Sequence, residues 1–341
     1  MSARRHVDVC IVGGGSFGTA LSVIVADRGR SVRMWVRREA QAEEINAQRT
    51  NGAYLLGRSL PSGISATADM KEAVTGAPIV LLAIPSKSFR DVARQAGEHL
   101  VGDQLLVHAT KGLEIQSFSR MSQILREETC ALKIGVLSGP NLAPELMAGH
   151  PAGSVVASRY DEVVTAVQTL FRGGHLRVYG GRDVVGVELG GAFKNIIAIA
   201  AGVIDGFGFG DNARSLLITR GLSEMALLGA SLGADVFTFG GLAGVGDLVA
   251  TAGSKLSRNH QVGERLASGQ SLDRILTELK HVAEGVPTTE AVHRRATLTG
   301  LRLPIVAAVH SVLFEGKSAQ FALEQLMALA VGDELSALRY R

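Results

Sequence analysis

A glycine-rich turn near the start of the chain constrains the fold more than any other feature. An apolar run ending at Val12 leads into the letters GGGSFG, and a stretch predicted as a helix over 19–28 follows at once. The spacing G-x-G-x-x-G in this position is typical of a dinucleotide site, in which glycines allow a tight turn, the approach of a pyrophosphate and close helix packing. A plain strand-to-helix turn is the alternative. The predicted cofactor contacts here are Gly13, Gly15, Ser16, Phe17 and Gly18.

The chain changes its periodicity about halfway along. Short β-branched runs alternate with amphipathic stretches from Val7 to about Tyr179, which predicts an α/β domain with a Rossmann-like, doubly wound and mostly parallel sheet. Helical periodicity without a convincing strand follows after Arg182. We therefore expect a dinucleotide-binding domain over 1–182 and an all-α substrate and catalytic domain over 183–341. The clearest predicted helices of the second domain are 212–232, 287–299, 304–314 and 318–330.

The composition gives no support for a metal-binding, membrane-spanning or nucleic-acid-binding protein. The chain has 341 residues with 46% hydrophobic content and a mean hydropathy of +0.22, enough for two cores. A net charge of +3 with scattered basic residues gives no argument for nucleic acid. Cys10 and Cys130 lack metal-ligand spacing, and we find no signal-like segment and no uninterrupted apolar run of about 18 residues. We expect a cytoplasmic protein with no metal, no membrane span and no nucleic-acid partner.

Two arginines stand where a dinucleotide site discriminates between NAD and NADP. The predicted second strand ends in the letters WVRRE, at 35–39. An acidic residue at this place binds the ribose 2′-hydroxyl, whereas an arginine accommodates the 2′-phosphate of NADP. Arg37 and Arg38 therefore predict that NADP(H) is preferred and NAD(H) possible. Two solvated arginines that open the next helix are the alternative, and Glu39 could still reach a ribose.

One lysine lies in a segment that is otherwise almost wholly apolar. Lys194 interrupts a run of Val, Leu, Ile, Ala and Gly over 185–203, which predicts a helix buried on most faces. Desolvation lowers the pKa of a buried lysine and allows it to exchange protons near neutral pH. Lys194 is therefore a candidate general acid/base. The alternative is a lysine at a domain boundary that keeps its ammonium group in water.

Seven motifs in a fixed order indicate a family. They are ATKGLE (109–114), SGPNLA (138–143), GGAFKN (190–195), GFGDNAR (208–214), LITRGLSEM (217–225), GLAGVGDL (241–248) and SRN (257–259). Together they resemble the bacterial-type NAD(P)-dependent glycerol-3-phosphate dehydrogenases, from Val9 to the final helix. The resemblance implies reversible reduction of dihydroxyacetone phosphate to sn-glycerol 3-phosphate, which supplies glycerophospholipid synthesis. It also implies a homodimer and an active site in a cleft between the two domains.

The resemblance also assigns roles to individual residues. Lys194 matches the general acid/base, Lys111 a second substrate lysine, and Asp247 an aspartate that holds Lys194 or a substrate hydroxyl; these three are the implied catalytic residues. The implied substrate contacts are Lys111, Gly139, Asn141, Lys194, Asp247, Ser257, Arg258 and Asn259. Besides the glycine loop and the two arginines, the implied cofactor contacts are Lys111, Ala143, Arg258, Val282 and Glu284. Helix capping alone would also explain the SRN motif.

The sequence departs from the family at a few places. Asn141 stands where the family usually has Ser or Thr, and Pro144 is rare, so the loop after Ser138 is expected to have a different shape. Phe193 is bulkier than the common leucine and changes only the packing.

Two other functions stay open on the sequence alone. One is a two-domain 3-hydroxyacid dehydrogenase, which would recognise a carboxylate in place of a phosphate. The other is a redox-sensing module that binds the dinucleotide without chemistry. The presence of both lysines and of Asp247 argues against the sensor, which has no need of them.

Overall fold

The computed structural model describes residues 6–55, 58–255, 257–279 and 283–330, and it divides into two compact units. Met1–Thr110 and Met121–Val184 form the first unit, and Lys111–Arg120 and Val185–Arg341 form the second. The domain boundary expected between residues 182 and 183 stays a prediction. One difference from it is clear, because the segment 111–120 leaves the first unit and packs with the second.

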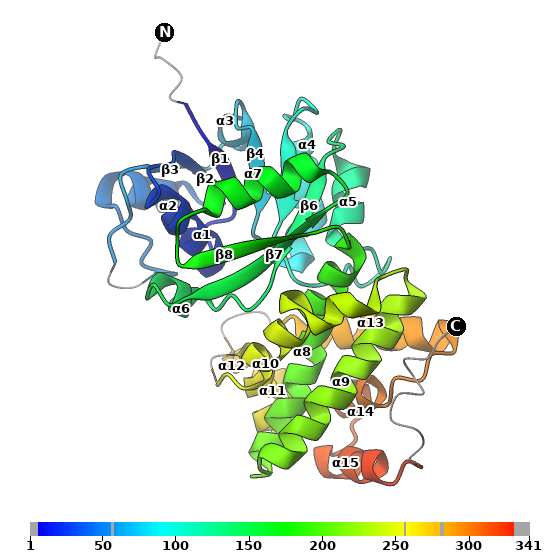
Figure 1. Ribbon diagram of the computed structural model, residues 1–341. Coiled ribbons are helices and arrows are strands. Elements are labelled where there is room, and N and C mark those ends of the chain that lie inside the picture. The colour runs from blue at the N-terminus through cyan, green and yellow to red at the C-terminus, as the bar shows by residue number, and fades with distance from the viewer. Residues whose placement is uncertain (1–5, 56–57, 256, 280–282, 331–341) are drawn as a thin grey trace. The chain divides into compact units, whose positions relative to one another are not determined.

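The first unit is built on an eight-stranded sheet (Figure 1). Its strands are β1 (Val9–Val12), β2 (Val32–Trp35), β3 (Ile64–Thr67), β4 (Ile79–Leu82), β5 (Leu105–His108), β6 (Ile134–Ser138), β7 (Ala152–Ser158) and β8 (Leu176–Gly181). Their order is β3-β2-β1-β4-β5-β6-β7-β8, and all neighbours are parallel except β6 and β7. The predicted α/β fold with a Rossmann-like sheet is confirmed.

Helices cover both faces of this sheet. Val9 and Ile11 of β1 point into one core, whereas Cys10 and Val12 point into another, as the alternation of side chains along a strand requires. The first core is closed by α1 (Ser16–Ala26), α6 (Ala143–Met147) and α7 (Asp161–Phe171), and the second by α3 (Met70–Val74), α4 (Phe89–Gly97) and α5 (Met121–Glu128). β1 is therefore buried on both sides, which explains its uninterrupted apolar sequence.

Two strands of this unit escape prediction from the sequence. β3 has the letters ISAT, too short and polar to stand out, and β8 ends in two glycines and is mostly exposed. Both lie at the edges of the sheet; β3 is short and has polar residues at two of its four positions, and β8 has little buried surface to impose a hydrophobic pattern.

The second unit is helical, as predicted. Its helices are α8 (Val184–Gly206), α9 (Asp211–Ser231), α10 (Asp247–Ala252), α11 (Arg258–Ala267), α12 (Leu272–Glu278), α13 (Gly285–Thr299), α14 (Pro304–Phe314) and α15 (Ala319–Met327). α8 is long and apolar enough to cross a membrane by length and composition, but 89% of its most apolar window is buried inside the protein. Leu189, Phe193 and Ile196 place it in the core of the unit, which is the ordinary setting of such a helix.

Two glycines bring α11 directly against α8. A Cβ atom on Gly202 of α8 would lie 1.9 Å from the carbonyl oxygen of His260, and one on Gly263 of α11 would lie 1.9 Å from that of Ile199. Neither position has room for a side chain, so the two backbones touch at this crossing. The beginning of α11, where the SRN motif lies, is thereby held beside the helix that carries Lys194.

A buried carboxylate in the LITRGLSEM motif links α9 to α14. Glu224 accepts hydrogen bonds from the backbone N–H groups of Ile305 (2.7 Å) and Val306 (3.2 Å), next to Pro304, which has no N–H to offer. Burial raises the pKa of Glu224 to about 7, although the two backbone bonds act in the opposite direction. Glu224 of α9 therefore caps the N-terminus of α14, and this part of the LITRGLSEM motif has a structural role.

Candidate active site

The glycine loop in the first unit has the shape that a dinucleotide site requires. Gly13 has φ +128°, and a Cβ atom there would lie 2.4 Å from the carbonyl oxygen of Ala83. A Cβ atom on Gly18 would lie 2.0 Å from the carbonyl oxygen of Gly13, whereas one on Gly15 would meet nothing within 4 Å. The outer two glycines are therefore demanded by close packing, and the middle one leaves open space where a pyrophosphate could lie.

The helix behind this loop begins without a side-chain cap. Gly15 is the N-cap residue of α1 and has no side chain with which to cap it, and the first turn contains no acidic residue. Free N–H groups and the positive end of the helix dipole make such a terminus an anion site. Ser16 and Phe17 lie in this first turn, as the cofactor prediction requires.

Two buried side chains that the sequence did not indicate hold the loop in place. Gln41 and Asn51 both donate to the carbonyl oxygen of Gly14, over 2.8 and 3.0 Å, and Gln41 also donates to Asn51 over 3.1 Å. Asn51 donates further to Thr19 of α1 over 2.8 Å. These residues lie about thirty positions from the loop, so no local spacing signals them.

Arg37 and Arg38 are exposed directly after β2. The register pairs Val12 of β1 with Trp35 of β2, so the arginines leave the sheet one strand away from the glycine loop. Arg38 is the N-cap residue of the short helix α2 (Glu39–Glu43), without a side-chain hydrogen bond to it. Their position fits contact with a 2′-phosphate and equally fits solvated arginines at a helix start.

The SGPNLA loop of the first unit contains an unsatisfied donor. Asn141 accepts a hydrogen bond from Ser154 over 3.0 Å, but its buried Nδ2 atom has no hydrogen-bond partner in the described part of the chain. Gly139 has φ +140°. Ala143 is the first residue of α6, and Pro144 follows it in the first turn. A buried amide without a partner is costly, so Asn141 is well suited to receive an acceptor from a ligand.

The three predicted catalytic residues meet in the second unit. Asp247 accepts a hydrogen bond from the amine of Lys194 at its Oδ1 atom. Its Oδ2 atom accepts from the amine of Lys111, with 2.6 Å between Oδ2 and Nζ. The Lys194 amine also donates to the hydroxyl of Thr251 over 2.8 Å. Lys194 and Asp247 are buried, and the Lys111 side chain is 20% exposed. The cluster is therefore complete within one unit.

The electrostatics of the cluster lower the pKa of Lys194 toward neutral pH. Burial of the amine is the main reason why the pKa of Lys194 falls to about 7. The attraction of Asp247 opposes this shift, and the repulsion of Lys111 adds to it. An amine with this pKa changes its protonation state near neutral pH, as a general acid/base must.

Local structure explains how these side chains reach one another. Lys194 lies in the middle of α8, and Asp247 and Thr251 lie one turn apart on α10, so they share a helix face. A Cβ atom on Gly190 would lie 2.4 Å from the carbonyl oxygen of Ala243, which shows how closely the segment before α10 approaches α8. Sequence reasoning missed Thr251, although its spacing of four from Asp247 could have indicated it.

The SRN motif begins α11, and two of its side chains are engaged within the protein. Ser257 caps the helix by accepting from the backbone N–H of His260 over 3.3 Å. Asn259 donates to Asn195 over 2.9 Å and accepts from the N–H of Gly285 over 2.8 Å. The capping alternative is thus realised for Ser257, and Asn259 joins the residue beside Lys194 to the start of α13.

Arg258 is exposed within this motif. Desolvation of its guanidinium lowers its pKa, against the attraction of Glu284, the N-cap residue of α13. These two residues, both predicted as cofactor contacts, therefore influence each other electrostatically. Val282, also predicted as a cofactor contact, lies outside the described residues.

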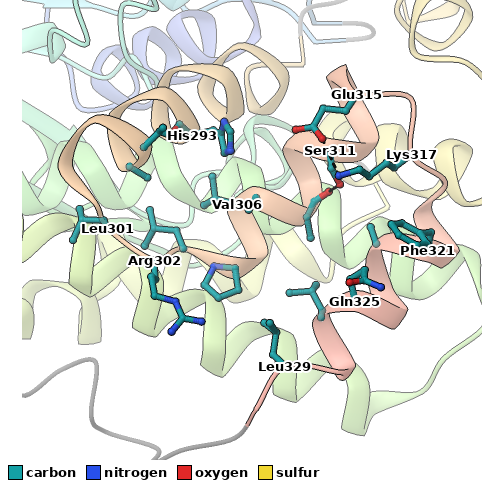
Figure 2. A pocket seen from close by; sticks show the side chains of 18 residues that line it. His293, Leu301, Arg302, Val306, Ser311, Glu315, Lys317, Phe321, Gln325 and Leu329 are labelled. Atoms are coloured by element: carbon teal, nitrogen blue, oxygen red, sulfur yellow. Dashed lines mark hydrogen bonds and ion pairs between the residues drawn. The ribbon is translucent and has the colours of Figure 1, made fainter.

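A cavity of about 590 Å³ lies elsewhere in the second unit. Figure 2 shows it between helices α13, α14 and α15, with His293, Arg302 and Phe321 among its lining residues. None of the predicted site residues lines it. The charged groups of the Lys194 cluster converge outside this cavity. Within the described ranges no group of three or more His, Cys, Asp or Glu side chains could hold a metal ion.

Comparisons with known proteins agree with this geometry. Residues 8–164 match the family model of the NAD-dependent glycerol-3-phosphate dehydrogenase N-terminus, and residues 183–324 match that of its C-terminus. The chain is 43% identical over 327 residues to glycerol-3-phosphate dehydrogenase [NAD(P)+] of Teredinibacter turnerae, covering 96% of both chains. It is 44% identical over 334 residues to the enzyme of that name from Geobacillus thermodenitrificans, covering 97% of both.

A solved structure extends the likeness to three dimensions. The crystal structure of glycerol-3-phosphate dehydrogenase from Coxiella burnetii superposes with a TM-score of 0.90 at 33% identity, over 94% of this chain and 98% of that one. Since both halves of the sequence match the family models and nearly the whole chain matches these relatives, this chain belongs to the NAD-dependent glycerol-3-phosphate dehydrogenase family.

Proposed function

We propose that this protein reduces dihydroxyacetone phosphate to sn-glycerol 3-phosphate with NAD(P)H, reversibly, and so supplies glycerophospholipid synthesis. The observation that carries the proposal is the cluster of Lys194, Asp247 and Lys111, in which a buried amine has a pKa of about 7. Relatives 43% and 44% identical bear the name of this activity.

The residues of the cluster fit the demands of ketone reduction. When bound, the reduced nicotinamide supplies the hydride that adds to the carbonyl carbon. Negative charge then develops on the carbonyl oxygen, and the Lys194 amine donates the proton that completes the alcohol. Lys111 stabilises that charge as a cation, and Asp247 orients both amines. In the oxidation direction the neutral Lys194 amine accepts the proton of the alcohol instead.

The binding roles form a second part of the proposal. We assign the phosphate of the substrate to Ser257, Arg258 and Asn259, of which Arg258 offers the exposed cation. We assign the remaining substrate contacts to Asn141 and Gly139, supported by the Asn141 Nδ2 atom, for which the described residues offer no hydrogen-bond acceptor. The proposed cofactor contacts are the glycine loop with Ser16 and Phe17, Arg37, Arg38, Lys111, Ala143, Arg258, Val282 and Glu284.

The remaining properties concern the setting of the enzyme. We assign a preference for NADP(H) because Arg37 and Arg38 follow β2 where an acidic residue would favour NAD. We further propose a cytoplasmic homodimer that needs no metal. Catalysis would require the nicotinamide to face the carbonyl carbon of the ketone whose oxygen Lys194 protonates.

The substrate is tested by NADPH oxidation with three ketones. We expect the purified protein to turn over dihydroxyacetone phosphate, and to show little activity with unphosphorylated dihydroxyacetone or a 3-keto acid. Turnover of the keto acid would instead support the hydroxyacid dehydrogenase. Binding of NADPH without turnover of any ketone would support the redox sensor.

Replacement of the acid/base tests the mechanism. Lys194→Ala removes the proton donor, and we expect kcat to fall by roughly a thousandfold or more while the Kd for NADPH stays nearly unchanged. Lys317→Ala removes a lysine of the same unit that is 46% exposed and serves as the matched control with full activity. Turnover that survives Lys194→Ala would refute the role of this lysine.

The two arginines are tested by a change of cofactor preference. Each charge-assisted contact with a 2′-phosphate contributes about 1.5–3 kcal/mol, which corresponds to roughly tenfold to hundredfold in affinity. The double substitution of Arg37→Ser with Arg38→Ser removes both contacts and should raise the KM for NADPH roughly hundredfold or more. The KM for NADH should change little, because NADH has no 2′-phosphate. Equal catalytic efficiency of the wild-type protein with NADH and NADPH would contradict the assigned preference.

A further inference from the structure

The segment that carries Lys111 is anchored in the second unit at both of its ends. Leu113 is buried in the core of that unit, and Phe118 packs against the same core. Leu113 and Arg120 pair through an antiparallel bridge, and the N–H of Glu114 donates to the carbonyl oxygen of Ser119 over 3.0 Å. The segment is therefore a closed loop. Contacts that hold Arg120 in place also restrict Leu113, which lies two residues from Lys111.

A partly buried ion pair ties this loop to the helix that carries Lys194. The guanidinium of Arg120 bonds to the carboxylate of Glu188 on α8, with the two side chains 18% and 2% exposed. Glu188 lies six residues before Lys194, about 9 Å along the helix axis. The position of Lys111 and the position of Lys194 thus both depend on α8, although the two lysines are 83 positions apart in sequence.

Weaker contacts hold the outer part of the loop. Arg294 of α13 donates to the carbonyl oxygens of Ile115 and Gln116, the second over 3.1 Å. The guanidinium of Arg295 lies 5.8 Å from the centre of the Phe118 ring. Arg294 is at the surface, and exposed contacts of this kind contribute little to stability. The ion pair of Arg120 with Glu188 therefore contributes most to holding the loop.

We propose that Arg120, through its ion pair with Glu188, is a positioning residue for Lys111. The pair fixes the loop against α8 so that the Lys111 amine meets Asp247 opposite Lys194. This inference rests on the proposed role of Lys111 in ketone reduction. It also means that the two lysines and Asp247 keep their mutual geometry within the second unit, whatever the position of the first.

The chemistry of the side chains explains why such an anchor is needed. Lysine has a flexible four-carbon stem, so its amine is well placed only when its backbone is. Displacement of a catalytic group by about 1 Å can reduce the rate roughly a hundredfold. Loss of Arg120 would free the end of the loop and leave the buried Glu188 carboxylate without this cation, which favours rearrangement there.

A double-mutant cycle tests whether Arg120 acts through Lys111. We expect Arg120→Gln to lower kcat/KM for dihydroxyacetone phosphate roughly tenfold to hundredfold. In the Lys111→Ala background the same substitution should change kcat/KM by less than about twofold, because the amine that it positions is already gone. Arg120→Lys keeps the cation without the planar fork and should recover part of the loss.

A matched control removes an arginine from an ion pair in the first unit. Arg90 of α4 pairs with Glu128 over 2.5 Å, with side chains 26% and 13% exposed, and Arg90→Gln should leave kcat/KM unchanged. Amide hydrogen exchange adds a readout that does not depend on turnover. Arg120→Gln should speed exchange in the peptide covering 111–120 and leave α4 as it was.

Several results would overturn the inference. One is a kcat/KM of Arg120→Gln equal to that of the wild-type protein. Another is a loss of kcat/KM from Arg120→Gln that is the same with and without the Lys111 side chain. The third is an unchanged rate of amide hydrogen exchange over 111–120. If the wild-type protein does not turn over dihydroxyacetone phosphate, the proposed function fails and hydrogen exchange alone decides whether the anchor exists. If Arg120→Gln does not fold, Arg120→Lys is measured in the same cycle, with the same two outcomes.

Discussion

The burial of the Lys194 amine is the constraint on which the second unit depends. An ammonium group is costly to remove from water unless a counter-ion and hydrogen bonds replace the solvent. Asp247 supplies the counter-ion, Thr251 supplies an acceptor, and Lys111 competes for the same carboxylate. One carboxylate between two lysines cannot neutralise both, so the surroundings favour release of a proton from the more deeply buried amine. The environment that makes Lys194 expensive to bury thus also gives it the properties of an acid/base.

The fold satisfies this constraint by close approach of backbones. Glycines at 190 and 202 allow the segment before α10 and the helix α11 to touch α8, and a side chain at either place would push them away. The segment 111–120 adds the remaining lysine, although the chain on both sides of it belongs to the first unit. Such an arrangement keeps the two lysines and Asp247 together in one unit and leaves the glycine loop in the other.

The sequence predicted those features that depend on local pattern. The glycine spacing, the alternation of strands and helices, and the lysine in an apolar helix each follow from residues near one another in the chain, and the structure has the predicted loop, sheet and helix. Features set by distant partners were not predicted. Gln41 and Asn51 support the glycine loop, and Glu224 caps α14, only because tertiary packing brings them there. The segment 111–120 likewise contacts a distant partner, because Arg120 pairs with Glu188, 68 positions away.

The most direct test of the account is the pH dependence of kcat/KM in both reaction directions. Ketone reduction needs a protonated Lys194 amine, so its rate should fall as pH rises through about 7, where the pKa of Lys194 lies. Oxidation of sn-glycerol 3-phosphate needs the neutral amine, so its rate should rise over the same interval. Opposite profiles with a common inflection near pH 7 are the predicted result. Profiles without an inflection between about pH 6 and pH 8, or with the same slope in both directions, would contradict the claim that a desolvated Lys194 transfers the proton.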